Sequence, residues 1–600
     1  MPGRPSHTPD LRSTYAERIL RFAEAIRREN RWMNLIALAR LGALVAAVWM
    51  LVLAIRDREA VFYALALLMA AGFLYLVTLH NRHQQQRELC RQLQALNETE
   101  QECLEHRYGS NPDGREFADP SHAWSHDLDI FGPGSLFQYL TRTSTLRGKE
   151  LLAQALTTEP EAPGTIPKRQ EIVRDLKDRL EFRQYFTGRG RMIEEEKEDL
   201  DNLSRWLEER SYIRTHSWLF YLALVMSVVS LGAVTAWIMG EVSIWGPLLV
   251  LTLNFTILSP FIARTNRYQS TISKKHLLLE GYAGLLKLIA GETFEPSDLK
   301  QKSVQARAGM REVARLSRLL NLFDQRLNML LGAILNGFFL FDFIMLRLLE
   351  NWKVRNSHEI LNWIGLIGWT DAMVSLGGFA FNHPGFTWPE IKPDQESMEL
   401  EALGHPLIPD QKRVDNDLRI GSEKVIVITG ANMAGKSTFL RSLGVNLVLA
   451  YTGCPVCARR FRTAYMGLSS SMRTADSLKD EESYFLAEIK KLQVIVRRME
   501  QGEQLLILLD EVLKGTNTTD KKRGSEGLIR RAIRYPVRCF IATHDLSLGK
   551  LEKEHPGAVV NFCFESYIRE MKLSFDYTIR PGIATNMNAS FLMKQMGIMD

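Results

Sequence analysis

The residues from Gly430 to Ser437 have the types and the spacing of a phosphate-binding loop. They read Gly-Ala-Asn-Met-Ala-Gly-Lys-Ser and match G-x-x-x-x-G-K-[ST] at every fixed position. Glycines allow successive backbone N–H groups to turn toward a phosphate, and the N-terminus of a following helix adds partial positive charge. In this arrangement Lys436 contacts the β- and γ-phosphates, and the hydroxyl of Ser437 binds Mg²⁺. The motif therefore predicts a site for a nucleoside triphosphate.

Two carboxylates and a histidine follow apolar runs further along the chain. The run 505–509 ends in Asp510 and Glu511, and the run 537–542 is followed by Thr543 and His544. Asp510 suits the shell of Mg²⁺, and Glu511 suits a base that orients or activates the attacking water. A histidine at the end of such a strand can contact a γ-phosphate, whereas without the other motifs His544 would be interpreted as structural. Together with the loop, these residues predict hydrolysis of the bound nucleotide.

The sequence also predicts the strands and helices that position these residues. Residues 424–429 are apolar and β-branched, which indicates a buried strand, and residues 438–443 open a helix. Beyond residue 409, apolar strand runs alternate with helices to the C-terminus, as in α/β nucleotide-binding domains. The loop-rich stretch 384–409 marks the boundary of this domain.

Two apolar hairpins upstream are long enough to cross a bilayer. Residues 34–80 contain two apolar stretches separated by a short charged turn, and residues 218–263 contain two uncharged stretches separated by 240–243. Tryptophans near the ends of the second pair resemble interfacial anchors. A fifth apolar stretch, 327–341, is shorter and contains two asparagines, so we interpret it as a core helix rather than a fifth span.

Positive charge gives the orientation of the hairpins. The turn of the second hairpin carries Glu241 and no lysine or arginine, whereas the turn of the first carries Arg56 and Arg58. More basic residues lie outside the turns than within them: Arg27, Arg28, Arg31, Arg40, Arg82, Arg87, Arg91, Arg264, Arg267, Lys274 and Lys275. We therefore predict a multi-pass protein of the inner (cytoplasmic) membrane, with both termini and the nucleotide site in the cytoplasm.

Composition sets the remaining limits. A chain of 600 residues, 46% of them hydrophobic, can form several folded domains, and a net charge of +6 does not by itself indicate a nucleic-acid partner. Six cysteines argue against a disulfide scaffold. Cys454 and Cys457 have metal or redox spacing, but no second pair accompanies them, so we interpret them as structural thiols. Residues 1–10 are polar and lack the apolar core of a signal peptide.

A periodic set of arginines lies between the second hairpin and the nucleotide-binding domain. Arg307, Arg311, Arg315 and Arg318 recur every three or four residues and therefore share one face of a helix. That face either binds phosphates of DNA or anionic lipid, or is simply solvated. The sequence leaves both interpretations open.

Several motifs together resemble the ATPase domain of the MutS family of mismatch-repair proteins. The resemblance rests on the segments 429–438, 509–520 and 542–545, with Ser483 to Ile489 similar to the family's S-x-F-x-x-E segment and Gly404-His405-Pro406 similar to its entry to the domain. It is close over residues 404–600. It is weaker over 129–185, which looks like the start of the family's core helical domain.

The resemblance implies roles for individual residues. ATP and Mg²⁺ would be the ligands, held by Asp510 and by the phosphate-loop residues Gly430, Ala431, Asn432, Met433, Ala434, Gly435, Lys436, Ser437 and Thr438. Asp510 and Glu511 would form the Walker B pair, and His544 would be the switch histidine. Residues 515–520 would form a loop between subunits. Ser483 would contact the γ-phosphate of the partner subunit, which implies a homodimer formed through the ATPase domain.

The sequence departs from the family at three places. Asp480-Glu481-Glu482 stand before Ser483, where the family usually has a glycine, so the contact with the partner is in question. Val414-Asp415 stand where the family tends to have an aromatic residue for the adenine. No G-x-F-x-E mismatch-reading segment is found, and the second hairpin occupies the place of the levers that lead to the family's DNA clamp.

The predicted fold class is α plus α/β, mostly helical with two transmembrane hairpins, followed by a P-loop ABC-type α/β ATPase domain. The predicted segments are a cytoplasmic N-terminal helix (1–33), hairpin one (34–80), the first part of a MutS core-like helical region (84–217), hairpin two (218–263), the second part of that region (265–390) and the ATPase domain (400–600).

The leading hypothesis is a membrane-anchored, dimeric, MutS-like ATPase that rearranges its helical core, with DNA or an unidentified protein as its partner. An ABC-type transporter component and a membrane tether with a regulatory, weakly active ATPase are the alternatives.

Overall fold

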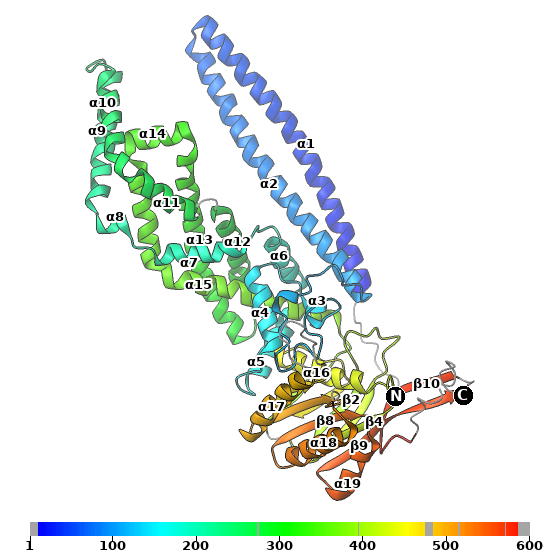
Figure 1. Cartoon of the computed structure of the whole chain (residues 1–600). Coiled ribbons are helices and arrows are strands. Elements are labelled where there is room, and N and C mark those ends of the chain that lie inside the picture. The colour runs from blue at the N-terminus through cyan, green and yellow to red at the C-terminus, as the bar shows by residue number, and fades with distance from the viewer. Residues whose placement is uncertain are drawn as a thin grey trace.

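The computed structural model describes residues 10–272, 275–393, 395–473, 484–513, 516–569 and 572–585. Helices form the N-terminal two-thirds of the chain, and a mixed α/β domain forms the C-terminal part at the opposite end of the molecule (Figure 1). Two helical hairpins extend away from the α/β domain. This division into α and α/β parts agrees with the sequence.

The first hairpin consists of the two long helices α1 (Leu11–Asp57) and α2 (Ala60–Leu104). The chain reverses at Arg58, which adopts a left-handed conformation (φ 56°). Almost none of the most apolar part of either helix is buried (6% and 0%), whereas the base of the hairpin packs on α6 (Leu180–Gly190) through Phe22, Leu89 and Leu93. The hairpin is therefore attached at its base and exposes an apolar tip.

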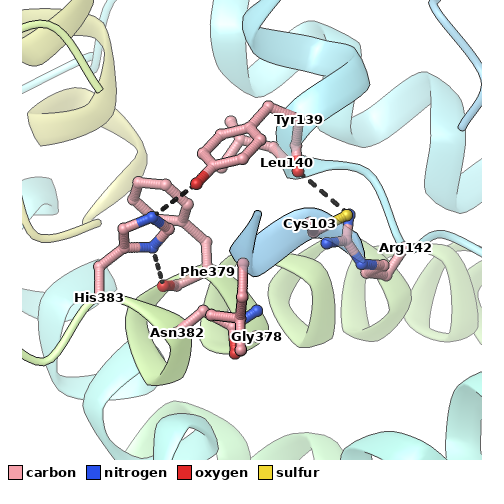
Figure 2. A pocket seen from close by; sticks show the side chains of 9 residues that line it. Cys103, Tyr139, Leu140, Arg142, Gly378, Phe379, Asn382 and His383 are labelled. Carbon is pink, nitrogen blue, oxygen red and sulfur yellow. Dashed lines mark hydrogen bonds between the residues drawn. The ribbon is translucent and has the colours of Figure 1, made fainter. Parts of the chain in front are cut away.

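A buried polar network joins the base of this hairpin to helix α15 (Phe341–Asn382), and Figure 2 shows the part of it around Tyr139, Arg142 and His383. Arg142 donates to Glu100 at 2.8 and 3.1 Å, and Asn382 donates to the same carboxylate at 2.7 Å. Tyr139 donates to Nε2 of His383 at 2.8 Å. Burial lowers the pKa of His383 to about 4, so its ring is neutral at pH 7 and can accept this bond. The network ties α2 to the end of α15, where the chain enters the α/β domain.

Helix α15 is the centre of the helical region. In the most apolar part of α15, 83% of the residues are buried. The helix therefore belongs to the core, although it is long and apolar enough to cross a bilayer. It packs against the helices α4 (Leu146–Thr157), α5 (Thr165–Lys177) and α13 (Ser297–Asp324). Asp371 on α15 accepts bonds from the backbone N–H groups of Ser144 and Thr145, both at 2.8 Å, and so holds the start of α4.

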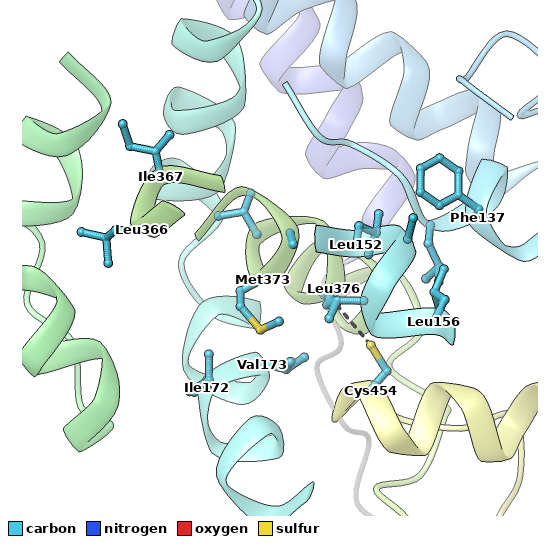
Figure 3. Packing of buried hydrophobic residues seen from close by; sticks show 14 of the residues in the cluster. Phe137, Leu152, Leu156, Ile172, Val173, Leu366, Ile367, Met373, Leu376 and Cys454 are labelled. Carbon is cyan, nitrogen blue, oxygen red and sulfur yellow. Dashed lines mark hydrogen bonds between the residues drawn. The ribbon is translucent and has the colours of Figure 1, made fainter. Parts of the chain in front are cut away.

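The same core continues into the α/β domain (Figure 3). Leu376 of α15, Leu156 of α4 and Val173 of α5 surround Cys454, whose thiol lies 3.9 Å from the carbonyl of Leu376. Burial raises the pKa of Cys454 and of Cys457 to about 12. All six cysteines are buried and free, as structural thiols are.

The second hairpin comprises α9 (Trp218–Ile238) and α10 (Trp245–Leu258). The short helix α14 (Met329–Phe339) packs across both of them. The interpretation of 327–341 as a core helix was wrong, because Met329 and Leu330 are 89% and 79% exposed. Only one face of α14, with Gly332, Asn336 and Gly337, is buried. The remaining helices of this region are α3 (Leu136–Leu140), α7 (Lys197–Glu208), α8 (Tyr212–Thr215), α11 (Ile262–Ile272) and α12 (Lys275–Gly291).

The α/β domain contains two sheets. The six-stranded sheet has the order β10-β9-β4-β8-β7-β6, with all neighbours parallel except β10 and β9. Its strands are β4 (Val425–Gly430), β6 (Gly467–Ser471), β7 (Leu505–Asp510), β8 (Val537–Thr543), β9 (Val559–Arg569) and β10 (Lys572–Pro581). The four-stranded sheet, in the order β1-β5-β2-β3, consists of β1 (Glu390–Lys392), β5 (Arg460–Ala464), β2 (Met398–Leu403) and β3 (Asn416–Ile420).

Helices cover both faces of the six-stranded sheet. Ile426 and Ile428 of β4 pack in the cluster that contains α16 (Lys436–Thr452), whereas Val425 and Val427 pack in the cluster on the other face. That second cluster contains side chains of α17 (Tyr484–Glu500) and α18 (Thr518–Ala532). Burial on both faces explains why β4 is apolar at consecutive positions rather than at alternate ones.

Two carboxylates of the helical region bind residues of the α/β domain. Asp127 is fully buried and accepts from Ser470 Oγ at 2.6 Å, from the backbone N–H of Arg473 at 2.9 Å and from Nζ of Lys491 at 2.6 Å. Glu159 pairs with Arg498 at 3.1 Å. Because Lys491 and Arg498 both lie on α17, this helix is fixed to the helical region at two points along its length.

Candidate functional site

The predicted phosphate-binding loop lies between β4 and α16, as expected from the sequence. Gly430 and Gly435 adopt positive φ angles of 150° and 111°. A Cβ atom on Gly430 would lie 2.5 Å from the carbonyl oxygen of Phe564, so only glycine fits there. Within the loop Ala434 is buried, whereas Asn432 and Met433 are exposed at its tip. Ser437 and Thr438 begin the helix beside them.

Lys436 closes this loop from within. Its side chain is buried, and Nζ donates to the carbonyl oxygens of Gly430 at 2.7 Å and Ala431 at 2.8 Å. The ammonium group is thus held at the centre of the loop by acceptors at its start. A phosphate placed there would compete with these carbonyls for the same charge, which is the role expected of this lysine.

The two carboxylates and the histidine meet at the same edge of the sheet. In the strand register Asp510 pairs with Ala542, and Thr429 pairs with Thr543, so the ends of β4, β7 and β8 are level. Nδ1 of His544 lies 3.4 Å from Oε1 of Glu511. The structure therefore brings together the loop, the acidic pair and His544, although Gly430 and His544 are more than 100 residues apart in the sequence. Ligands bind at this edge in open parallel sheets.

The backbone at the acidic pair is held in an unusual conformation. Glu511 has a φ of 51°, and its N–H donates to the carbonyl of Ala542 at 2.9 Å. Two residues further, Leu513 also has a positive φ (62°), and its N–H donates to the carboxylate of Glu488. Positive φ angles of non-glycine residues concentrate at functional sites. Glu488 is the glutamate of the S-x-F-x-x-E segment, and its positioning role was not assigned from the sequence.

Other predicted residues lie outside the described part of the chain. Ser483 and the acidic residues 480–482 are among them, as is Gly515 of the loop between subunits. Of that loop, Asn517 is described: its side chain accepts from the N–H of Asp520 at 2.9 Å and caps α18. The predicted contact between Ser483 and a partner subunit therefore stays a prediction.

A cavity of about 270 Å³ opens beside the phosphate-binding loop. Its lining includes Val414, Gly435, Phe439 and Tyr577. The ring of Tyr577 lies 3.3 Å from the position of a Cβ atom on Gly435, so the ring and the loop are in contact. Asn416 fixes this arrangement, because it donates to the carbonyl of Tyr577 at 3.1 Å and accepts from the N–H of Ile579 at 2.7 Å.

Tyr577 brings an aromatic ring to this cavity, which the sequence did not predict. The doubt about adenine stacking arose because Val414-Asp415 replace an aromatic residue, and Val414 does line the cavity. The ring comes instead from β10, at an irregularity of the strand register between Phe575 and Ile579. Nothing in the local sequence distinguishes this tyrosine from any other strand residue.

The residues present fit a magnesium ion bound together with phosphates. Mg²⁺ prefers oxygen ligands and is usually held by one or two carboxylates plus substrate phosphates. Ser437 at the start of α16 and Asp510 at the end of β7 supply such oxygens from neighbouring parts of the edge. Within the described ranges, no group of three or more His, Cys, Asp or Glu side chains could hold a metal without additional ligands.

Comparison with known proteins agrees with this geometry. The family model of MutS domain V matches residues 426–595. The DNA mismatch repair protein MutS of Chlorobium phaeovibrioides is 34% identical over 198 residues, which are 31% of this chain and 22% of that protein. The MutS protein of Thermotoga sp. (strain RQ2) is 33% identical over 175 residues, which are 28% of this chain and 22% of that protein.

A third relative is the DNA mismatch repair protein MSH3 of Meyerozyma guilliermondii. It is 26% identical over 252 residues, which are 39% of this chain and 26% of that protein. The chain thus spans 22% to 26% of the length of these three relatives. The C-terminal part of the chain, with the loop, the acidic pair and His544, thus matches MutS domain V and is similar to the corresponding part of MutS mismatch-repair proteins.

Proposed function

We propose that this chain is an ATPase of the cytoplasmic membrane, which binds and hydrolyses ATP as a MutS-like dimer and thereby rearranges its helical core. The observation that carries the proposal is the cluster at the edge of the six-stranded sheet. There the loop 430–437, the pair Asp510 and Glu511, and His544 lie around level strand ends, beside a cavity of about 270 Å³.

The residues divide the work of ATP hydrolysis. Backbone N–H groups of the loop and the N-terminus of α16 bind the phosphates, and Lys436 exchanges its two carbonyl acceptors for phosphate oxygens. Ser437 and Asp510 would hold Mg²⁺, which neutralises charge that develops on the phosphates. Glu511 accepts a proton from the attacking water or orients it, and His544, next to Glu511, contacts the γ-phosphate side of the site.

The first test is ATP turnover by the full-length protein in detergent. Hydrolysis that depends on added Mg²⁺ is expected, because Ser437 and Asp510 supply only part of a coordination shell. A folded protein that binds ATP and Mg²⁺ without measurable turnover would contradict the proposed activity. It would favour the alternative of a tether with a regulatory ATPase.

Tyr577→Ala is expected to weaken the affinity for ATP about 10-fold. Stacking of a base on an aromatic ring contributes roughly 1–3 kcal/mol, and about 1.4 kcal/mol corresponds to a factor of ten. Turnover at saturating ATP should be retained, since Tyr577 lies on the side of the loop away from Glu511. Titration with a fluorescent ATP analogue measures the effect, and Tyr577→Phe, which keeps the ring, is the matched control. Equal loss in both variants would contradict a stacking role.

Support for the membrane anchor comes from the two hairpins (Figure 1). Their helices are long and apolar enough to cross a bilayer, and most of their apolar surface is not buried by other parts of the chain. Trp218, Tyr221 and Trp245 are exposed at 58%, 62% and 74%, near the ends where interfacial aromatic residues are expected. Arg40, the only charge between residues 34 and 55, lies 5.6 Å from the ring of Phe73 on the facing helix.

The full-length protein is expected to remain in the membrane fraction after extraction at high salt and high pH. Four exposed apolar helices bind hydrocarbon strongly, whereas a protein attached only by surface charge is released by salt. Sedimentation followed by immunodetection measures the distribution, with detergent as the positive control for release. Recovery of the protein in the supernatant without detergent would contradict the anchor.

The dimer and its DNA ligand are proposed from the family relationship and from one surface. Arg307, Arg311, Arg315 and Arg318 are all exposed along roughly 16 Å of α13. In the part of the chain that the structure describes, none of these four arginines forms an ion pair. These four arginines are thus available to bind phosphate groups. The names of the relatives suggest that DNA would supply these phosphates.

A further inference from the structure

The helix α14 (Met329–Phe339) bridges the ends of two core helices beside the second hairpin (Figure 1). Its 11 residues measure about 16 Å along the axis, roughly half of a hydrocarbon layer of about 30 Å, so it is too short to cross a bilayer. The chain reverses at Leu340, which has a φ of 46°, and returns as α15. Residues 327–341 therefore leave and rejoin the core on the same side.

The outer surface of this segment is apolar and uncovered. Leu327, Met329, Leu330 and Ile334 are exposed at 56%, 89%, 79% and 53%. Residues 327–341 contain no charged side chain. An exposed apolar run of this kind is unfavourable in water and indicates contact with lipid or with protein.

The position of α14 along the second hairpin distinguishes these two partners. The side chain of Asn254 in α10 donates to the carbonyl of Gly337 at 2.7 Å, and Ser227 in α9 donates to the carbonyl of Phe339 at 3.2 Å. Ser227 lies roughly 14 Å along α9 from Trp218, at about 1.5 Å per residue. If Trp218 marks the membrane surface, α14 lies well inside the hydrocarbon region, at the depth of the apolar band of α9 and α10.

The charges at the two ends of the segment neutralise each other. Arg326 donates to both carboxylate oxygens of Asp342, at 2.9 and 2.7 Å, and the Asp342 side chain is fully buried. Asn336 adds two bonds to Asp342, one through its side-chain amide at 3.1 Å and one to its backbone N–H at 2.9 Å. Ionisable groups at membrane depth are expected to face the protein interior and to pair in this way. Irregular backbone is tolerated there only when protein satisfies it.

We propose that residues 327–341 form a re-entrant segment whose outer face contacts the acyl chains of the cytoplasmic leaflet. The inference rests on the proposed membrane anchor and extends it: α9, α10 and α14 form one lipid-facing unit, and Arg326 and Asp342 join its base to the core helix α15. The partner is hydrocarbon rather than a second copy of the chain, because the exposed face of α14 is continuous with the exposed apolar faces of α9 and α10.

The test uses spin labels on full-length protein in vesicles of phosphatidylcholine and phosphatidylglycerol. One label is placed at Leu330→Cys in α14 and, in a second variant, at Met329→Cys. Val228→Cys in α9, exposed at 72%, reports on the anchor, and Val494→Cys in α17, exposed at 53%, reports on water. The native cysteines are all buried and therefore do not compete for the label. Accessibility of each label to oxygen, which dissolves in lipid, and to a water-soluble nickel chelate is measured.

Labels at Leu330→Cys and Met329→Cys are expected to match the label at Val228→Cys, with high access to oxygen and low access to nickel. Nickel access like that at Val494→Cys, with Val228→Cys still in lipid, would overturn the inference and leave the anchor intact. Protection from both reagents would also overturn it, because it would indicate a protein contact such as a second copy. Nickel access at Val228→Cys itself would instead refute the anchor.

Discussion

Lys436→Ala is expected to reduce ATP turnover by at least about 100-fold. A positioned charge that stabilises the transition state of a phosphoryl transfer is worth roughly 10² to 10³ in rate. Lys436 is the buried cation at the centre of the loop, bonded to the carbonyl oxygens of Gly430 and Ala431. Its removal leaves the phosphates without that charge and the two carbonyls without their donor. Steady-state release of phosphate at saturating ATP and Mg²⁺ measures the loss.

The loss must be separated from unfolding of the loop. Lys553→Ala removes an exposed lysine from α19 (Leu551–Glu554) of the same domain and is expected to keep full activity. Thermal unfolding of both variants shows whether the domain remains folded. Full turnover by a folded Lys436→Ala protein would refute the assignment of the nucleotide site to this loop.

Glu511→Gln is expected to stop hydrolysis while ATP remains bound. Loss of a general base typically costs roughly 10² to 10⁴ in rate, whereas the amide keeps the size and the hydrogen-bonding oxygen of the side chain. Glu511 follows the end of β7, beside His544, and its backbone N–H donates to the carbonyl of Ala542, a bond that the substitution does not remove. The fold of the site should therefore survive the substitution. Single-turnover measurements and retention of labelled ATP separate hydrolysis from binding.

The variant also tests the proposed dimer. If ATP holds two ATPase domains together, Glu511→Gln should accumulate as an ATP-bound dimer, because hydrolysis no longer releases it. Light scattering in detergent, with and without ATP, measures this. Glu554→Gln is the matched control, because Glu554 is half-exposed and its ion pair with Arg530 contributes little. Unchanged turnover in Glu511→Gln would assign the base to another residue.

The loop, the acidic pair and His544 were predictable because each of them belongs to a short segment with a recognisable pattern. A phosphate-binding loop must join a buried strand to a helix, and both neighbours are recognisable by their apolar pattern within a few residues. The strands before Asp510 and His544 are likewise buried on both faces, so they appear as continuous apolar runs. All four elements, β4, α16, β7 and β8, are found at the predicted positions.

The cavity beside the loop was not predictable. Tyr577 follows Gly435 by more than 100 residues, and it reaches the loop because β10 pairs with β9, which pairs with β4. The register of β10 is irregular there, and Asn416 donates to the carbonyl of Tyr577 and accepts from the N–H of Ile579, which fixes the backbone that carries the ring. Register and long-range pairing depend on which surfaces the whole domain buries, and single-sequence patterns do not contain this information.

The stretch 327–341 shows the same limit for the helical part of the chain. Its composition is that of a buried helix, and composition alone cannot tell protein from lipid as the surroundings. The tertiary structure exposes one face of α14 and buries the glycines and Asn336 on the other. It also joins Arg326 to Asp342 across the segment, a contact with no local signal.

The sequence by itself determined the chemistry of the loop, the acidic pair and the apolar hairpins, because each depends on residue types at close spacing. Tertiary structure decided which of these residues meet, which aromatic ring lines the cavity, and how α17 is fixed to the helical region through Asp127 and Glu159. The physical reason is that contacts between distant segments follow from packing of complete faces and from pairing of buried charges. Those terms act only once the whole chain has folded.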